Sequence, residues 1–450
     1  MRRLRVGAFS VGALCWFLLW VGINTGPWNL QLDLIESSWT GFFNGFRAAL
    51  PLIVLAFWIF HLLVRRRAAI RSFTLPEALW LYYGLVMLAA SIYADPWFDC
   101  AYWGIAYLSA FAAAEMYMQE SFSYKRAGDL NLLNWIFGSA VLATLVWIAR
   151  GQLVAPTSMG ASGYGVLGRI PTVAGMPMVR ASGISRLAAV PAIVAFPVVW
   201  QPRRPARIFA AAIFAPSAYL VWVMQSRGSL TSFGVALILV MIMGGGASRR
   251  TGIALLVLLA TIFTLGFIPA DTVHHLWLFA TRGTEGQQLA SMSGRTLIFH
   301  DAWEAIQAAP LIGYGPQADR RVLTTVPNAQ NGVLYALLCA GFLGGSGYIA
   351  GLAVSWLMLF RIARYRHLLD PAEKITFVQI VGMMAFFTIR SYPENCAALF
   401  SVDLLLQLPA IVYIGEFDRC LKSAIVARQV VRSSGVQPIF ALHSSVHINN

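Results

Sequence analysis

Apolar stretches divide this chain, and the segments between them alternate between two sides. On one of these sides the basic residues are all arginines. Eleven arginines lie there: Arg47, Arg150, Arg169, Arg180, Arg186, Arg227, Arg282, Arg295, Arg320, Arg321 and Arg390. Planar guanidinium groups hold phosphate oxygens through bidentate, charge-assisted hydrogen bonds and keep their charge at any relevant pH. Each of these side chains either belongs to a site for a phosphate-bearing molecule or reaches the phosphates of the surrounding lipid.

Apolar stretches interrupt the chain and have to position these arginines. The sequence is 58% hydrophobic, with 33 basic and 19 acidic residues, and its mean hydropathy is +0.67. About 20 apolar residues cross a bilayer core, so we predict an all-α, multi-pass membrane protein, in which a net charge of +14 does not require nucleic acid. The twelve expected spans are residues 7–24, 46–64, 74–93, 100–118, 131–149, 184–200, 206–225, 229–246, 252–269, 331–360, 375–390 and 396–415.

The basic residues predict the orientation of these spans. If the amino terminus is cytoplasmic, the eleven arginines face outward and the remaining 22 of the 33 basic residues face the cytoplasm, as the positive-inside bias requires. Both termini are then cytoplasmic. We expect a single transmembrane domain over residues 1–415 and a polar cytoplasmic tail over residues 416–450.

Two of the outer loops, residues 150–183 and 270–330, are much longer than the usual connection between packed helices. The first is rich in Gly, Pro, Ser and Met, which is typical of a mobile lid. In the second, an apolar face at helical spacing predicts an amphipathic helix at the membrane surface, ended by Pro310 and Gly313. The residues of that face are Leu297, Ile298, Ala302, Ala305 and Ile306.

An ordered set of short motifs runs through residues 180–415. The segments are RASG at 180–183, SRG at 226–228, SGR at 293–295, PLIGYG at 310–315, QNxxL from Gln330 to Leu334 with Leu337, Gly341 and Gly344 after it, and RSYPE at 390–394. In this order they resemble the signature of the bacterial O-antigen ligase and Wzy-type polysaccharide polymerase superfamily. Each motif alone is weak evidence for this superfamily, whereas the set of motifs in this order is fairly specific to it.

The resemblance implies a GT-C-type glycosyltransferase of the bacterial inner membrane, with its active site facing the periplasm. Its donor and acceptor would be oligosaccharides on undecaprenyl diphosphate, within membrane lipid and with a possible chain-length co-polymerase as partner. No cofactor, metal or nucleic acid is expected. The sequence contains no CxxC, HExxH or GxxxxGK[ST] pattern and no GxGxxG pattern that follows a predicted strand, which agrees with this.

Carried over onto matching positions, the resemblance assigns two groups of binding residues. The residues expected to bind the diphosphate are Arg295, Arg180, Arg227 and Arg390. The residues expected to bind the acceptor or its sugar are Asn331, Arg320, Arg321 and Tyr314. Arg227 could instead face lipid headgroups, and the pair at 320–321 could simply solvate the loop.

The catalytic base departs from the family pattern. The histidine that is thought to accept the proton of the attacking hydroxyl aligns with Gln330, whose amide cannot act as a base at neutral pH. Three substitutes lie near the outer face, each with a structural alternative. Glu394 could merely cap a helix, His300 projects about 140° away from Arg295 around the predicted helix, and Asp319 could pair with the neighbouring arginines.

Asp403 lies well inside the last predicted span. An ionisable group there is either functional or hydrogen-bonded between helices, and we favour the structural role. Of the five cysteines, Cys100 and Cys396 lie near outer helix ends, where an oxidising periplasm would allow a disulfide.

The function most consistent with these features is that of a Wzy-type polymerase. The nearest rival is an O-antigen ligase, which moves a finished chain onto lipid A-core, and a protein oligosaccharyltransferase is third. The missing histidine favours the polymerase modestly. The rival from another class is a lipid-linked oligosaccharide flippase or transporter, which the location of charge in outer loops disfavours.

Overall fold

All regular structure in the described part of the chain is helical. A computed structural model describes residues 10–23, 39–64, 72–119, 123–149, 181–224, 226–244, 246, 249–254, 295–324 and 328–433. The ninth predicted span, the first long loop with Arg180, and residues 270–294 of the second loop therefore lie wholly or almost wholly outside the described residues.

Eight of the described helices are long and apolar enough to cross a membrane. They are α2 (Trp39–Val64), α3 (Leu75–Ala90), α5 (Tyr124–Ala149), α6 (Ala181–Val199), α7 (Arg204–Val223), α8 (Arg227–Gly244), α14 (Gly332–Arg364) and α15 (Pro371–Arg390). The other helices are α1 (Val11–Gly22), α4 (Trp97–Met118), α12 (Arg295–Ala308), α13 (Ala318–Val322) and α16 (Val402–Ser433), with the 3-10 turns η2 (Ser91–Tyr93) and η3 (Arg366–Leu368). The all-α, multi-pass class is confirmed. Among the described residues eight helices meet these criteria, and the ninth of the twelve predicted spans lies almost wholly outside them.

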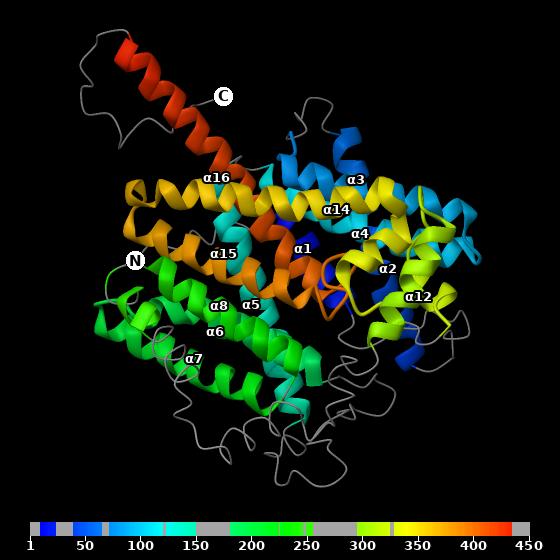
Figure 1. Ribbon diagram of the computed structural model, residues 1–450, viewed down its shortest axis with the longest axis horizontal. Helices are drawn as coiled ribbons and strands as arrows, with labels where there is room; N and C mark the ends of the chain where they lie inside the picture. The colour runs from blue at the N-terminus through cyan, green and yellow to red at the C-terminus, as the bar shows by residue number, and fades with distance from the viewer. Residues whose placement is uncertain are drawn as a thin grey trace.

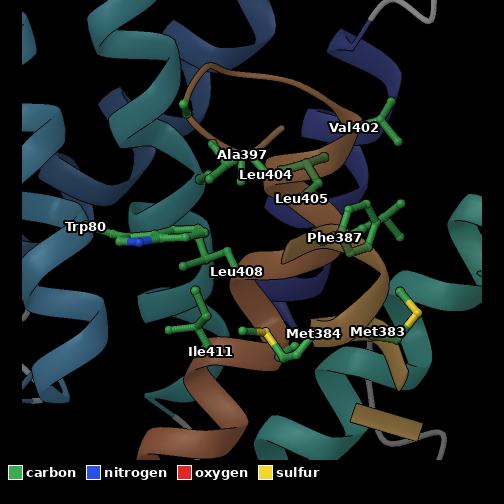
Figure 2. Packing of buried hydrophobic residues seen from close by; sticks show 14 of the residues in the cluster. Trp80, Met383, Met384, Phe387, Ala397, Val402, Leu404, Leu405, Leu408 and Ile411 are labelled. Atoms are coloured by element: carbon green, nitrogen blue, oxygen red, sulfur yellow. The ribbon is translucent and has the colours of Figure 1, made fainter. Parts of the chain in front are cut away.

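Helix α16 forms the centre of the bundle. Its side chains from Leu404 to Ile414 are all buried, as expected for a helix that is apolar around its whole circumference. It packs against α3, α4, α5, α14 and α15. Figure 2 shows Leu408 facing Trp80 of α3 and Ile411 beside Met384 of α15.

The two ends of α16 differ from the predicted twelfth span. Residues 391–401 form turns rather than helix, and the helix begins at Val402. It then continues to Ser433, well past the predicted end of the span, and its last part projects from the bundle (Figure 1). Helix α12 lies at the opposite end of the bundle in the same view. Asp403 therefore lies at the end of the core helix that faces α12 and the surrounding turns.

Helix α12 occupies the position predicted for the amphipathic helix, but its buried face is narrower. Ile298, Ala302 and Ile306, spaced four residues apart, are buried, whereas Leu297 is exposed. This face packs on α14. It thereby fixes Arg295, the first residue of α12, at the end of the bundle.

Helix α14 is broken in its first half, which explains the unusual length of the tenth predicted span. Gly341 has φ 59° and ψ −166°, a backbone conformation that essentially only glycine adopts. The break frees peptide groups that the turn at 310–315 then satisfies. Four hydrogen bonds join the two segments: Tyr314 N to Leu338 O, Gly315 N to Cys339 O, Phe342 N to Pro310 O and Leu343 N to Leu311 O.

Gly341 therefore has to remain glycine if the turn is to dock. A Cβ atom at this position would lie 2.2 Å from the carbonyl oxygen of Leu311. We expect Gly341→Ala to lower the free energy of unfolding by about 2 kcal/mol or more, because strain and lost hydrogen bonds add. Gly234→Ala in α8 is the matched control, since nothing lies within 4 Å of its Cβ position. Equal thermal unfolding midpoints of the two detergent-solubilised variants would contradict this account.

Candidate functional site

Three turns meet at the end of the bundle that carries α12. They comprise residues 310–317, residues 328–331 and residues 391–401. Asn395 joins two of them, because its Oδ1 accepts from the backbone N–H of Asn331 at 3.0 Å and its Nδ2 donates to Asn328 Oδ1 at 3.0 Å. The N–H of Gly332 also donates to Ser391 O at 2.7 Å. The motifs around residues 330 and 390, about 60 residues apart in sequence, thus form one polar surface.

Arg295 is anchored by the residue that stands at the family histidine's position. Its Nε donates to Gln330 Oε1 at 2.8 Å. Gln330 adopts the left-handed backbone conformation, with φ 48°, and its N–H donates to Asn328 Oδ1 at 3.0 Å. Gln330 therefore acts here as a hydrogen-bond acceptor that orients the guanidinium group of Arg295.

Further charges surround Arg295. Partial burial lowers the pKa of its guanidinium, the charge of Glu394 raises this pKa, and the charge of Arg227 lowers it again. Glu394 also lies 3.9 Å from Nη2 of Arg390, with its side chain 34% exposed. Arg295, Arg227, Arg390 and Glu394 thus interact electrostatically although they come from α12, α8, α15 and the turn that follows α15.

Arg390 lies beneath this surface and is only 3% exposed. Its Nη1 forms an ion pair with Asp403 Oδ2 at 2.9 Å. The same carboxylate oxygen accepts from Nη1 of Arg186, on α6, at 3.0 Å. The predicted diphosphate-binding residue Arg390 is therefore enclosed and already paired, and Asp403 is a bridge between two buried arginines.

The described part of the cluster contains more arginines than carboxylates. The guanidinium groups of Arg186, Arg227, Arg295 and Arg390 lie with the carboxylates of Glu394 and Asp403. Positive groups held together at the edge of a poorly solvated region favour the binding of an anion. A diphosphate diester carries two negative charges and is an anion of this kind.

Asp319 lies one layer deeper, in α13. It is buried, and its Oδ2 accepts hydrogen bonds from Ala329 N at 3.3 Å and Asn395 Nδ2 at 3.1 Å. Burial raises the pKa of this carboxyl group, although the amide donors and the charge of Arg320 act in the opposite direction. These hydrogen bonds come from neutral amides rather than from the neighbouring guanidinium groups, in contrast to the ion pair that the sequence suggested.

Most of the predicted acceptor-binding side chains serve local structure. Asn331 caps α14, accepting from Val333 N and Leu334 N at 2.9 and 3.0 Å. The Tyr314 hydroxyl donates to Ala305 O at 3.1 Å, and Arg321 donates to Tyr314 O at 2.6 Å. Arg320 is exposed at the end of α13. Of the four, only the side chain of Arg320 extends from the surface toward solvent.

His300 contacts another residue of its own helix. It is exposed on α12, and its Nδ1 lies 3.5 Å from Glu304 Oε1. Together with Asp301, these side chains place their ligand atoms within 4.8 Å of one another, a spacing that could hold a metal ion. Exposed groups of this kind are common without an ion, so they do not argue for a metal centre. Arg180, the remaining predicted diphosphate ligand, lies outside the described residues.

The disulfide considered from the sequence is absent from the structure. Cys100 and Cys396 are both buried and both are free thiols. Cys396 instead lies beside Arg390, whose Nη1 is 3.5 Å from the sulfur atom.

Three residues that the sequence did not single out belong to the site. Arg186 pairs with Asp403, Ser229 Oγ accepts from Arg390 Nε at 3.4 Å, and Asn395 joins the turns. Asn395 directly follows the RSYPE motif and Ser229 directly follows SRG, so an extension of each motif by one residue would have included them. Arg186 had only its outer location as a signal.

The comparison with known families identifies the segment that contains much of this site. A family model described as O-antigen ligase matches residues 211–349, from within α7 to within α14. Over these residues the chain is similar to the O-antigen ligase family, and the resemblance to the superfamily is thereby confirmed. The matched segment includes Arg227, Arg295, Gln330 and the docked turn at 310–315. No curated protein matches the chain.

Asp319 makes stability depend on pH. Because burial raises its pKa in the folded protein, the folded state binds a proton more tightly than the unfolded state. Stability is then greatest at acidic pH and falls as the pH rises toward the folded pKa. Asp319→Asn cannot titrate, so its unfolding midpoint relative to wild type should rise between about pH 4.5 and about pH 7.5. An equal difference between the two proteins at both pH values would contradict the assignment.

Proposed function

We propose that this protein is a Wzy-type polymerase that joins oligosaccharide repeat units carried on undecaprenyl diphosphate. The growing chain on its lipid diphosphate is the donor, and a sugar hydroxyl of a new lipid-linked unit is the acceptor. The reaction takes place on the periplasmic face of the bacterial inner membrane. The O-antigen ligase family domain and the eight membrane-spanning helices support this proposal at the level of a membrane enzyme of polysaccharide synthesis.

The observation that carries the proposal is the placement of Arg295 on the polar surface. This guanidinium is half-buried, is oriented by Gln330 and lies within the electrostatic influence of Arg227 and Glu394. A diphosphate leaving group gains charge as its bond to the sugar breaks. Fixed guanidinium groups stabilise that developing charge without reorganising, which is often the largest contribution to catalysis.

The reaction is a single displacement at the anomeric carbon. The hydroxyl oxygen of the acceptor forms a bond to this carbon while the bond from the carbon to the diphosphate oxygen breaks. The electron pair of the broken bond stays on undecaprenyl diphosphate, where Arg295 and Arg227 hold it. The proton of the hydroxyl passes to a carboxylate of the enzyme.

Glu394 is the carboxylate best placed to accept that proton. It is partly exposed, it lies on the same polar surface as Arg295, and Arg390 holds it from below. The other candidates are less suitable, because Asp319 is enclosed by amide donors and His300 faces solvent beside Glu304. Diphosphate leaves without protonation, so the mechanism requires no general acid.

An O-antigen ligase is the second candidate, because the matching family model carries that description. One experiment separates the two. Purified protein is given lipid-linked repeat units alone, and the products are separated on a gel. A ladder of longer lipid-linked chains supports the polymerase, whereas transfer that begins only after lipid A-core is added supports the ligase. Product in neither reaction would contradict both functions and favour a flippase or transporter.

Arg295→Ala should lower the rate of chain transfer by about 100-fold or more, since one fixed donor to the leaving group is lost. The variant should still fold, because the guanidinium lies at the surface end of α12. Arg364→Ala, an exposed arginine in the last turn of α14, is the matched control and should keep the wild-type rate. Normal product from Arg295→Ala would exclude a role of this residue in binding the diphosphate.

Glu394→Gln tests the catalytic base. Loss of a general base lowers rates by about 100- to 10,000-fold, and glutamine keeps the size of the side chain. His300→Gln serves as the comparison, because a large loss in that variant instead would assign the base to α12. The rates of both variants are measured with saturating lipid-linked units, so that weakened binding is not mistaken for slow chemistry.

A further inference from the structure

Asp403 lies where three helices meet beneath the polar surface. It is in the first turn of α16, its side chain is 6% exposed, and Oδ2 contacts Arg390 of α15 and Arg186 of α6. The amino-terminal end of a helix favours a negative charge. One carboxylate is thus shared between two cations, so neither arginine is fully neutralised.

The contacts of Arg390 fix the direction of its guanidinium group. Asp403 holds Nη1 at 2.9 Å, and Ser229 of α8 accepts from Nε at 3.4 Å. A guanidinium group is planar and rigid, so these two contacts determine where the remaining nitrogen points. Nη2 faces Glu394 at 3.9 Å. Arg390 therefore acts on the surface through Glu394 and is itself too enclosed to bind substrate as it stands.

We propose that Asp403 is a positioning residue that sets how strongly Arg390 holds Glu394. Because Asp403 occupies Nη1, it keeps Arg390 from closing fully onto Glu394. Arg186, on the far side of Asp403, determines how much of the Asp403 charge remains for Arg390. The buried relay from Arg186 through Asp403 to Arg390 thus determines how strongly positive charge holds the Glu394 carboxylate at the surface. This inference rests on the proposed role of Glu394 as the base.

The charged groups around Glu394 are few enough to predict the effect of each change. Arg390 approaches it from α15, Arg295 acts on it from α12, and the thiol of Cys396 lies in the turn that follows it. Arg227 acts on Arg295. Among the described residues, Asp403 and Arg186 are the charged groups that reach Glu394 through Arg390.

The test is the pH dependence of the transfer rate with lipid-linked repeat units, measured for four variants. Asp403→Asn frees Arg390 to pair with Glu394, so the acid limb of the profile should move to lower pH by about one pH unit. The maximal rate should fall roughly tenfold, because a carboxylate held more tightly by a cation is a weaker base. Arg390→Gln removes the cation, and its acid limb should move to higher pH.

Asp418→Asn is the matched control. Asp418 is also a buried carboxylate of α16 that bridges two cations, with Arg361 at 2.5 Å and Lys422 at 3.1 Å, but it lies toward the opposite end of the helix. A purely structural role for Asp403 would make both variants less stable and leave both profiles in place. The inference requires that only Asp403→Asn moves the acid limb.

Arg186→Gln keeps the inference testable if Asp403→Asn fails to fold. This variant retains the buried pair of Asp403 with Arg390 as a neutral unit. Asp403 then neutralises Arg390 more completely, so the acid limb should move to higher pH, although Arg186 is separated from Glu394 by two side chains. Unmoved acid limbs in Asp403→Asn and Arg186→Gln would overturn the inference while leaving the proposed function intact. A wild-type protein without transfer activity would overturn both.

Discussion

The hydrogen bonds between the 310–315 turn and the broken α14 are the constraint on which the site depends. A helix interrupted inside a bundle leaves peptide groups that have to find partners, because an unsatisfied group there is costly. The turn supplies these partners through four backbone bonds. Since α12 precedes the turn and α13 follows it, this docking also determines where Arg295 and Asp319 lie. The same four hydrogen bonds thus satisfy the peptide groups of the broken helix and fix the geometry of the site.

Ion pairs form a second constraint, in addition to these backbone hydrogen bonds. Buried ions are tolerated only when they are paired, and removal of one partner from such a pair typically costs about 3–5 kcal/mol. The protein pairs Arg390 and Arg186 with a single carboxylate and leaves Arg295 and Arg227 nearer the surface. Among the described residues, the deep part and the outer part of the cluster therefore each hold two arginines beside one carboxylate.

Several features could be predicted from the sequence because they depend on local patterns. Arg295 at the start of an amphipathic helix and the multi-pass helical class both follow from spacing. The break at Gly341 could not be predicted, because the surrounding apolar residues continue through it. The bridge at Asp403 was also missed, since Arg186 lies 217 residues away and no periodicity connects the two.

Helix α16 is held at two points along its buried part. Asp403 ties its first turn to α6 and α15, and Asp418, near the middle of the helix, ties it to Arg361 of α14, about 22 Å further along the same helix axis. A displacement of α16 along its axis would separate these opposite charges. The two ion-pair sites therefore hold the described helices around α16 in one register.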